Sequence, residues 1–212
     1  MAERTNSRIV LKALKEFGLL LESDAKLPSV SGLVAGEPVR GSWWTHQRSH
    51  EIFAVLQEVV DHKDVLVTKL VSGKVTFVHR PLWPDLISIG MAREPWQMAE
   101  LSLAGQTLLD QIDQSGSLQT NRLEWPRKVK TSKPGDAVRE LERLLLIHSE
   151  EFHTDSGAHA KLIESWEHWT RRIGVRCERV GVENAKRALE ERIEALNARF
   201  GASAGVPWPT TI

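Results

Sequence analysis

Two histidines, His46 and His50, stand four residues apart in a segment with helical apolar spacing. On a helix this spacing points both rings from one face, where they could bind a metal ion. The segment lacks the glutamate that follows the first histidine in the zinc-protease motif, which disfavours a protease. A zinc site would need a third ligand from elsewhere, and the alternative is a pair of histidines at a helix start with local hydrogen bonds.

Three more histidines, His148, His153 and His159, fall in a predicted β-hairpin. If its turn is centred on Ser156, the second and third face each other across the strands. Neighbouring acids would complete a metal site, namely Glu150, Glu151 and Asp155. The histidines could instead meet phosphates or a narrow minor groove once protonated, or simply be exposed polar residues of the hairpin.

The other common chemistries have weak or no signatures. The one cysteine, Cys177, lies between Arg176 and Glu178-Arg179, which could lower its thiol pKa, but it has no placed partner. The chain has no Gly-rich phosphate loop, nucleophile elbow or dinucleotide fingerprint, so no cofactor and no metal are expected. Catalytic residues stay unknown, and the sequence leaves open whether the chain is an enzyme.

One arrangement of elements occurs twice. An amphipathic helix is followed by a Gly-centred hairpin in residues 45–80 and again in residues 133–166. In the first, a helix over 45–61, capped by Thr45, precedes strands over 64–71 and 74–79 joined by the two-residue turn Ser72-Gly73. In the second, a helix capped by Asp136 precedes strands over 147–154 and 158–166. Helix followed by hairpin is how a winged helix ends.

Further helices are predicted over 6–22, from Pro28, over 85–92, over 102–114 with Leu103 inward, and over 182–200. The last has an apolar stripe that must pack on its own chain or on a second copy, which would give a homodimer through 182–200. The fold class is therefore mainly α with small β-hairpins (α+β), in tandem winged-helix-like units. The predicted domains are 1–94, 95–172, a packing helix over 173–200 and a loosely held tail over 201–212.

Composition restricts the partners. Lys plus Arg equals Asp plus Glu at 28 each, so nucleic acid cannot be bound by bulk charge alone. Residues 122–143 are locally basic, with seven basic against four acidic side chains. No run is apolar enough for a membrane span or a signal peptide, and a cytoplasmic location is the expectation.

The second unit has a basic connector followed by a helix and a β-hairpin. This order predicts double-stranded DNA as a partner. The expected contacts are Lys133, Arg139, Arg143, Lys161 and Arg48. A separate aromatic cluster could line a pocket for a flipped base or small ligand, formed by Trp43, Trp44, His46 and His50.

The order of elements resembles that of the AlkZ-type winged-helix proteins, which are bacterial DNA glycosylases that excise alkylated or cross-linked bases. Residues 135–145, Gly-Asp-Ala-Val-Arg-Glu-Leu-Glu-Arg-Leu-Leu, with the hairpin that follows, correspond to one unit, and residues 41–84 to another. The resemblance implies tandem winged helices and a link to DNA repair. That family's Gln-x-Gln or Gln-x-Asp pair is matched only by the letters Gln111-Ile112-Asp113, on a helix expected to be structural, so no catalytic residue is carried over.

Three functions follow. The leading one is a winged-helix DNA-associated protein without demonstrated catalysis. The second is a base-excision glycosylase or small-ligand enzyme that uses the Trp43–His50 cluster. The third is a protein-interaction module that dimerises through the last helix.

Overall fold

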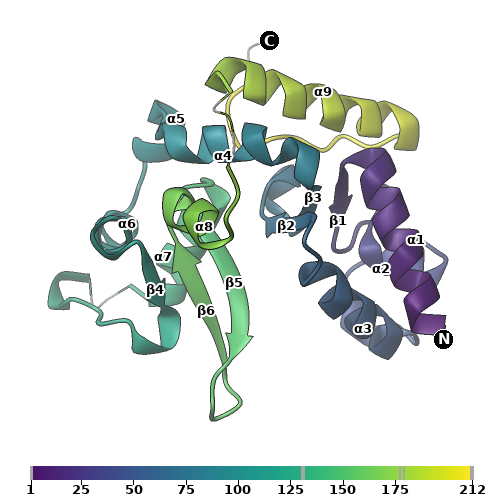
Figure 1. Cartoon of the computed structure of the whole chain (residues 1–212), viewed down its shortest axis with the longest axis horizontal. Coiled ribbons are helices and arrows are strands. Elements are labelled where there is room, and N and C mark those ends of the chain that lie inside the picture. Colours follow the sequence, from purple (N-terminus) through teal and green to yellow (C-terminus); the bar gives the residue numbers. More distant parts are fainter. Residues whose placement is uncertain (1, 130–131, 177, 179, 211–212) are drawn as a thin grey trace.

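The computed structural model describes residues 2–129, 132–176, 178 and 180–210. It is mainly helical with two small three-stranded antiparallel sheets, so the predicted α+β fold class is confirmed (Figure 1). Each sheet belongs to one helix–strand–helix–hairpin unit. The two hairpins lie in separate sheets, as two winged-helix units require.

The first unit has strand order β1-β3-β2. Its elements are α1 (Ala2–Phe17), β1 (Leu19–Leu21), α2 (Val30–Ala35), the 3-10 turn η1 (Trp43–Thr45), α3 (Ser49–Val60), β2 (Val65–Thr68) and β3 (Thr76–His79). The predicted first helix runs five residues past the observed end of α1. Gly18 takes a φ of 77°, which ends the helix, and the buried Leu19–Leu21 then pair with β3.

The second unit repeats this order as β4-β6-β5. Its elements are α6 (Leu103–Ser115), β4 (Ser117–Gln119), the 3-10 turns η4 (Thr120–Arg122) and η5 (Arg127–Val129), α7 (Pro134–Arg143), β5 (His148–His153) and β6 (His159–Glu164). The short turns stand where α2 stands in the first unit. Ser102 caps α6 through the Gly105 amide, while Leu103 is 55% exposed rather than inward.

The two hairpins differ from each other. In the second, His153 pairs with His159 as predicted. In the first, the expected two-residue turn is wrong, because the ladder stops at the Thr68–Thr76 pair and residues 69–75 form a longer connection with a 3-10 turn η2 (Val71–Gly73). Burial explains the difference, since Leu70 and Val71 turn into the core instead of continuing the strand.

Two predicted helix caps are also wrong. Thr45 lies in η1, and α3 begins only at Ser49 after Arg48. Asp136 lies inside the first turn of α7, whose N-cap is Lys133, followed by Pro134 at a position where its missing N–H costs nothing.

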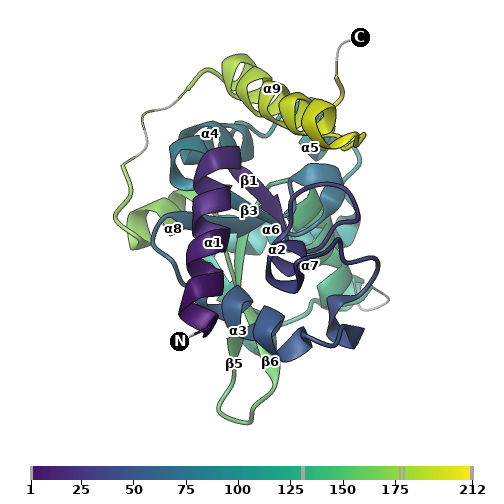
Figure 2. The ribbon, with the colours of Figure 1, turned by 90° about the vertical axis from the view of Figure 1, so that its right-hand side faces the viewer.

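A shared layer joins the units. It contains the 3-10 turn η3 (Arg80–Leu82), α4 (Trp83–Ala92), α5 (Pro95–Met98), α8 (Trp166–Arg172) and α9 (Val182–Phe200). Figures 1 and 2 show α9 lying across α4. The stripe Ala185, Leu189, Ile193 and Leu196 is buried in one core with α4 and α8, so α9 packs on its own chain. The predicted boundary at residues 93–95 falls between α4 and α5, and the division into domains stays a prediction.

The C-terminal segment is not loosely held, contrary to expectation. Trp208 is 3% exposed, and its indole Nε1 donates to Glu190 Oε1 at 2.6 Å. Gly205 exchanges hydrogen bonds with Ser72 in the first unit. The segment 201–210 is therefore fixed between α9 and the first sheet. Among the described helices, none has the length and apolar character to cross a lipid bilayer.

The close approach of α8 to α4 depends on Gly90. A Cβ added there would lie 2.3 Å from Trp166 Nε1, whose ring is buried. We expect Gly90→Ala to lower the free energy of unfolding by about 1–3 kcal/mol, because the overpacking cost exceeds the gain in helix propensity. Urea denaturation measures this. Gly135→Ala, in a helix with an open Cβ position, is the control, and a Gly90→Ala protein as stable as this control would contradict the packing.

Candidate nucleic-acid interface

The acidic side chains of α7 are largely committed to contacts inside the protein. Glu140 Oε1 accepts a hydrogen bond from the Ser102 amide at 2.9 Å, and its Oε2 accepts one from Ser102 Oγ at 2.6 Å. This carboxylate therefore sits at the N-terminus of α6, where the helix dipole favours negative charge. Gly105 leaves the space for it, since a Cβ there would lie 2.4 Å from Glu140 Oε2.

Glu142 forms the centre of a charge cluster between the two units. Its Oε1 lies 2.5 Å from Lys161 Nζ on β6, and its Oε2 lies 2.7 Å from Lys69 Nζ in the β2–β3 connection of the first unit. Ser149 Oγ also donates to Oε1, at 2.6 Å. Burial opposes ionisation of this 5% exposed residue, but the two lysines and the serine together hold its pKa below the ordinary value. The carboxylate is thus ionised and links both units.

The outward side of α7 carries basic residues. Lys133, Arg139 and Arg143 are all exposed, at the N-cap and along the helix. Arg139 makes an ion pair with Asp136 one turn earlier, and both remain exposed. In a winged helix, the helix before the hairpin is the one that enters the major groove.

The two other predicted DNA contacts have partners inside the chain. Lys161 is bound to Glu142 and is about one-quarter exposed. Arg48 pairs with Glu51, with Nη2 at 2.5 Å from Oε2, and donates to the Ala35 carbonyl. Both belong to ion pairs, which distinguishes them from Lys133 and Arg143.

The histidines of the second hairpin divide into two groups. The rings of His153 and His159 face each other at 4.4 Å near its exposed tip, as predicted. His148 lies at the other end of β5, where it is 3% exposed beside Trp166 and Trp169. The structure therefore does not bring the three histidines together.

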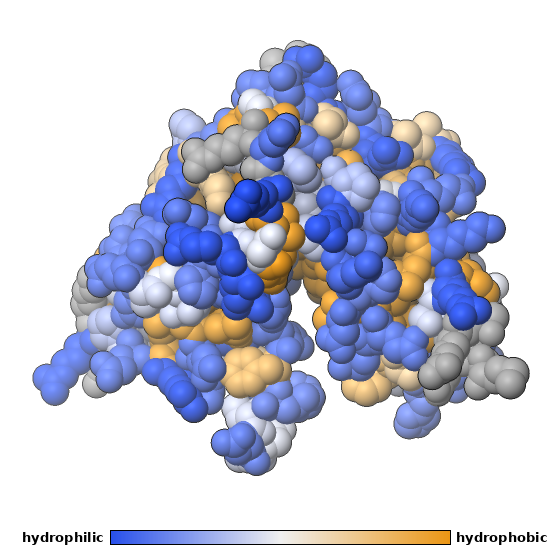
Figure 3. Space-filling model, in the orientation of Figure 1, coloured by the Kyte–Doolittle hydropathy of each residue, from blue (hydrophilic) through white to orange (hydrophobic). Residues whose placement is uncertain are grey.

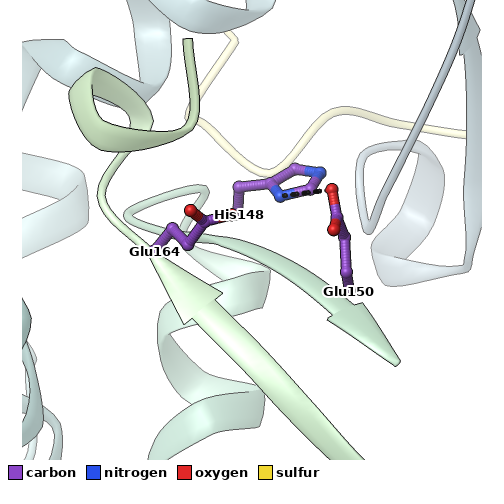
Figure 4. A group of neighbouring side chains, drawn as sticks. All are labelled: His148, Glu150 and Glu164. Atoms are coloured by element: carbon purple, nitrogen blue, oxygen red, sulfur yellow. Dashed lines mark ion pairs between the residues drawn. The ribbon is translucent and has the colours of Figure 1, made fainter. Parts of the chain in front are cut away.

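His148 instead groups with Glu150 and Glu164, whose candidate ligand atoms lie within 4.8 Å of one another (Figure 4). A cation from the protein already occupies this group. Arg172 Nη2 lies 2.8 Å from Glu150 Oε1 and 2.6 Å from Glu164 Oε2. The guanidinium forms ion pairs with both carboxylates, so this cluster is a structural ion pair network. Sequence reasoning missed Glu164 and Arg172, which lie on different elements.

The predicted aromatic cluster contains one buried and one exposed indole. Trp43 is 5% exposed, and its Nε1 donates to Glu22 Oε1 at 3.2 Å, whereas Trp44 is 63% exposed and stacks on Trp43. Burial raises the pKa of Glu22 against the effect of the Trp43 hydrogen bond, and the charge of Glu151 in the other unit raises it further. Figure 3 shows the hollow between the two units.

His46 and His50 are not on one helix, because His46 precedes α3. The His46 ring accepts from the Arg48 amide at 3.1 Å and lies 3.3 Å from Glu37, while His50 is exposed. The zinc site was predicted from an i,i+4 pair on one helix, and that spacing does not apply here because His46 lies before α3. The arrangement agrees with the alternative of histidines that make local hydrogen bonds at a helix start.

Two other candidate motifs were the Gln-x-Asp letters and the single cysteine. Gln111 and Asp113 lie on α6, where Gln111 donates to the Glu124 carbonyl at 3.5 Å and Asp113 pairs with Arg93. Cys177 lies outside the described residues. The two residues that match the glycosylase motif, Gln111 and Asp113, therefore take part in structural contacts.

The Glu142 cluster escaped sequence analysis although α7 contained a signal for it. Ala137, Val138 and Leu141 form the buried stripe of this helix, and Glu142 is buried with them. An acid on an apolar stripe needs a cation in the core. Only the folded chain shows that one of the two cations is Lys69, which lies 73 positions away in the sequence.

We expect Glu142→Gln to lower the free energy of unfolding at pH 7 by roughly 3 kcal/mol, because two lysines lose their buried counter-charge. The lowered folded-state pKa means that the ionised form stabilises the fold above pH 4.5, and that this contribution is lost as the pH falls through the folded-state pKa. Urea denaturation should show a large difference in unfolding free energy between wild type and Glu142→Gln at pH 7, and a smaller difference in acid. Glu151→Gln, exposed on β5, should change little, and an equal loss in both variants would refute the role of Glu142.

Burial lowers the pKa of His148 to about 4, although Glu150 and Glu164 act in the opposite direction. A histidine neutral in the fold stabilises it above its unfolded pKa of about 6.5, and this contribution is lost as the pH falls from there toward 4. An NMR titration of its ring should give a midpoint near 4. His148→Asn should reduce the loss of stability between pH 6.5 and pH 4. His153→Asn, at the hairpin tip, is the control and should not reduce it. A midpoint near 6.5 for the His148 ring would contradict its burial.

No curated protein and no solved structure matches this chain. A family model described as AlkZ related matches residues 5–202, which cover both three-stranded sheets, the shared layer and most of the charge clusters above. The chain therefore belongs to the AlkZ-related family.

Proposed function

We propose that this protein binds double-stranded DNA through its second winged-helix unit, with α7 in the major groove and the β5–β6 hairpin beside it. One observation supports this most strongly. Of the three acids on α7, Glu140 and Glu142 are held in internal contacts, while Lys133, Arg139 and Arg143 are exposed. The outer surface of α7 is thus more cationic than its sequence suggests.

Such a surface favours a polyanion despite the net charge of zero. A cationic side chain on a phosphate releases condensed counterions, so each contact adds about 0.9 to the magnitude of the slope of log K against log salt concentration. Three contacts would give a slope of about −2.7. Asp136 reduces the field of Arg139 in the free protein, and a phosphate could replace it as the partner of the guanidinium.

The two alternative functions have less support. A base-excision activity would need catalytic groups, and Gln111 and Asp113 are engaged along α6. A homodimer through residues 182–200 stays an untested prediction, and the apolar stripe that suggested it already packs on α4.

We expect the double substitution Arg139→Ala and Arg143→Ala to weaken binding to random duplex DNA and to reduce the magnitude of the salt slope by about 1.8. Fluorescence anisotropy with a labelled duplex, over a salt series, measures both. Arg187→Ala, an exposed charge removal on α9, is the control. A wild-type chain that fails to bind duplex at low ionic strength, or a double variant that binds like the control, would disprove the proposal.

A further inference from the structure

The connection between β4 and α7 carries a concentration of positive charge outside the three α7 contacts proposed above. Residues 122–133 contain five basic side chains and one acid, Glu124. Arg122 and Arg127 are exposed, and among the residues that the structure describes neither guanidinium has an ion-pair partner. Two exposed arginines without an acidic partner keep their full charge available for an anion such as a phosphate.

The first half of this connection lies against the β5–β6 hairpin. Thr120 Oγ1 accepts a hydrogen bond from the Lys161 amide on β6 at 2.8 Å. The turn η4 continues from Thr120 to Arg122, and Leu123 then packs on the core of the second unit. The backbone of Arg122 is therefore held on both sides, beside the hairpin that would flank the DNA.

Trp125 joins the second half of the connection to the start of α7. Its indole Nε1 lies 2.9 Å from the carbonyl oxygens of both Val129 and Ser132. Ser132 is followed directly by Lys133, the N-cap of α7, and Arg127 lies in the turn η5 that the indole closes. The indole thus ties the backbone that carries Arg127 to the beginning of the helix proposed for the major groove.

The N-terminal end of α7 also receives a guanidinium from within the helix. A Cβ added at Gly135 would lie 4.0 Å from Arg139 Nη1, so this side chain reaches back toward the helix start and Lys133. In helix-turn-helix proteins, the element before the recognition helix crosses the DNA backbone. Here the turns η4 and η5, with Arg122 and Arg127, take the place of that element.

We propose that Arg122 and Arg127 bind phosphates of the duplex held by α7, and that Trp125 is the positioning residue of this contact. This inference rests on the proposed function and adds a backbone-binding surface to it. Phosphate contacts fix the register of a protein on the duplex and carry no direct sequence information, so this surface should raise the affinity for every sequence. Two further contacts change the expected slope of log K against log salt concentration from about −2.7 to about −4.5.

Fluorescence anisotropy with a labelled random duplex, over roughly a fourfold range of salt concentration, tests the two arginines. We expect the affinity of wild type to fall about 500-fold over this range and that of Arg122→Ala/Arg127→Ala about 40-fold, because two of five phosphate contacts are absent. The control Arg8→Ala/Arg187→Ala removes two exposed cations from α1 and α9. It changes the net charge equally and should keep the salt dependence of wild type.

Trp125→Phe tests the positioning role, because it removes the two indole hydrogen bonds and keeps an aromatic ring. We expect it to weaken binding and to reduce the magnitude of the salt slope. The larger part of this loss should be absent when Arg127 is already alanine, since the two residues act on one contact. Thermal unfolding verifies that each variant is folded.

A wild-type slope near −2.7, or an Arg122→Ala/Arg127→Ala variant that binds like the control, would overturn this inference and leave the proposed function in place. A wild type that fails to bind duplex at low ionic strength would overturn both. A loss from Trp125→Phe by the same factor with and without Arg127 would overturn the positioning role of the tryptophan.

Discussion

The buried carboxylate of Glu142 needs neighbouring cations, and much of the arrangement follows from that need. A carboxylate in a core is stable only when its charge is neutralised and its oxygens are bonded. Here one lysine comes from β6 of the same unit and the other, Lys69, from the first unit. The charge cluster therefore joins the second unit to the first by ion pairs. These ion pairs add to the apolar contacts that α4, α8 and α9 provide.

The same cluster determines which charges reach the surface. With Glu142 turned inward and Glu140 on the N-terminus of α6, α7 exposes mainly its basic residues. Lys161, by contrast, is drawn out of the candidate DNA surface by its bond to Glu142. A chain with equal numbers of acids and bases can in this way present a cationic helix, because the two signs are sorted between the inside and the outside.

Local patterns predicted the elements that local physics determines. The helix over 182–200 and the second hairpin have the predicted positions, because apolar periodicity and a glycine turn specify them. Three features failed because tertiary burial overrode the pattern. Gly18 ends α1 early so that β1 can join the sheet, Leu70 and Val71 leave the first hairpin for the core, and Trp208 anchors a tail that looked free. The cluster around Glu142 joins residues from both units, which no local pattern encodes.

The most direct test of the account is an NMR titration of the isotopically labelled chain with a short random duplex at low salt, followed by amide chemical shifts. DNA binding through the second unit predicts salt-sensitive shifts concentrated in α7 and in the tip of the β5–β6 hairpin, while α9 stays unperturbed. Shifts confined to α1 or α9, or no shifts at all, would contradict it.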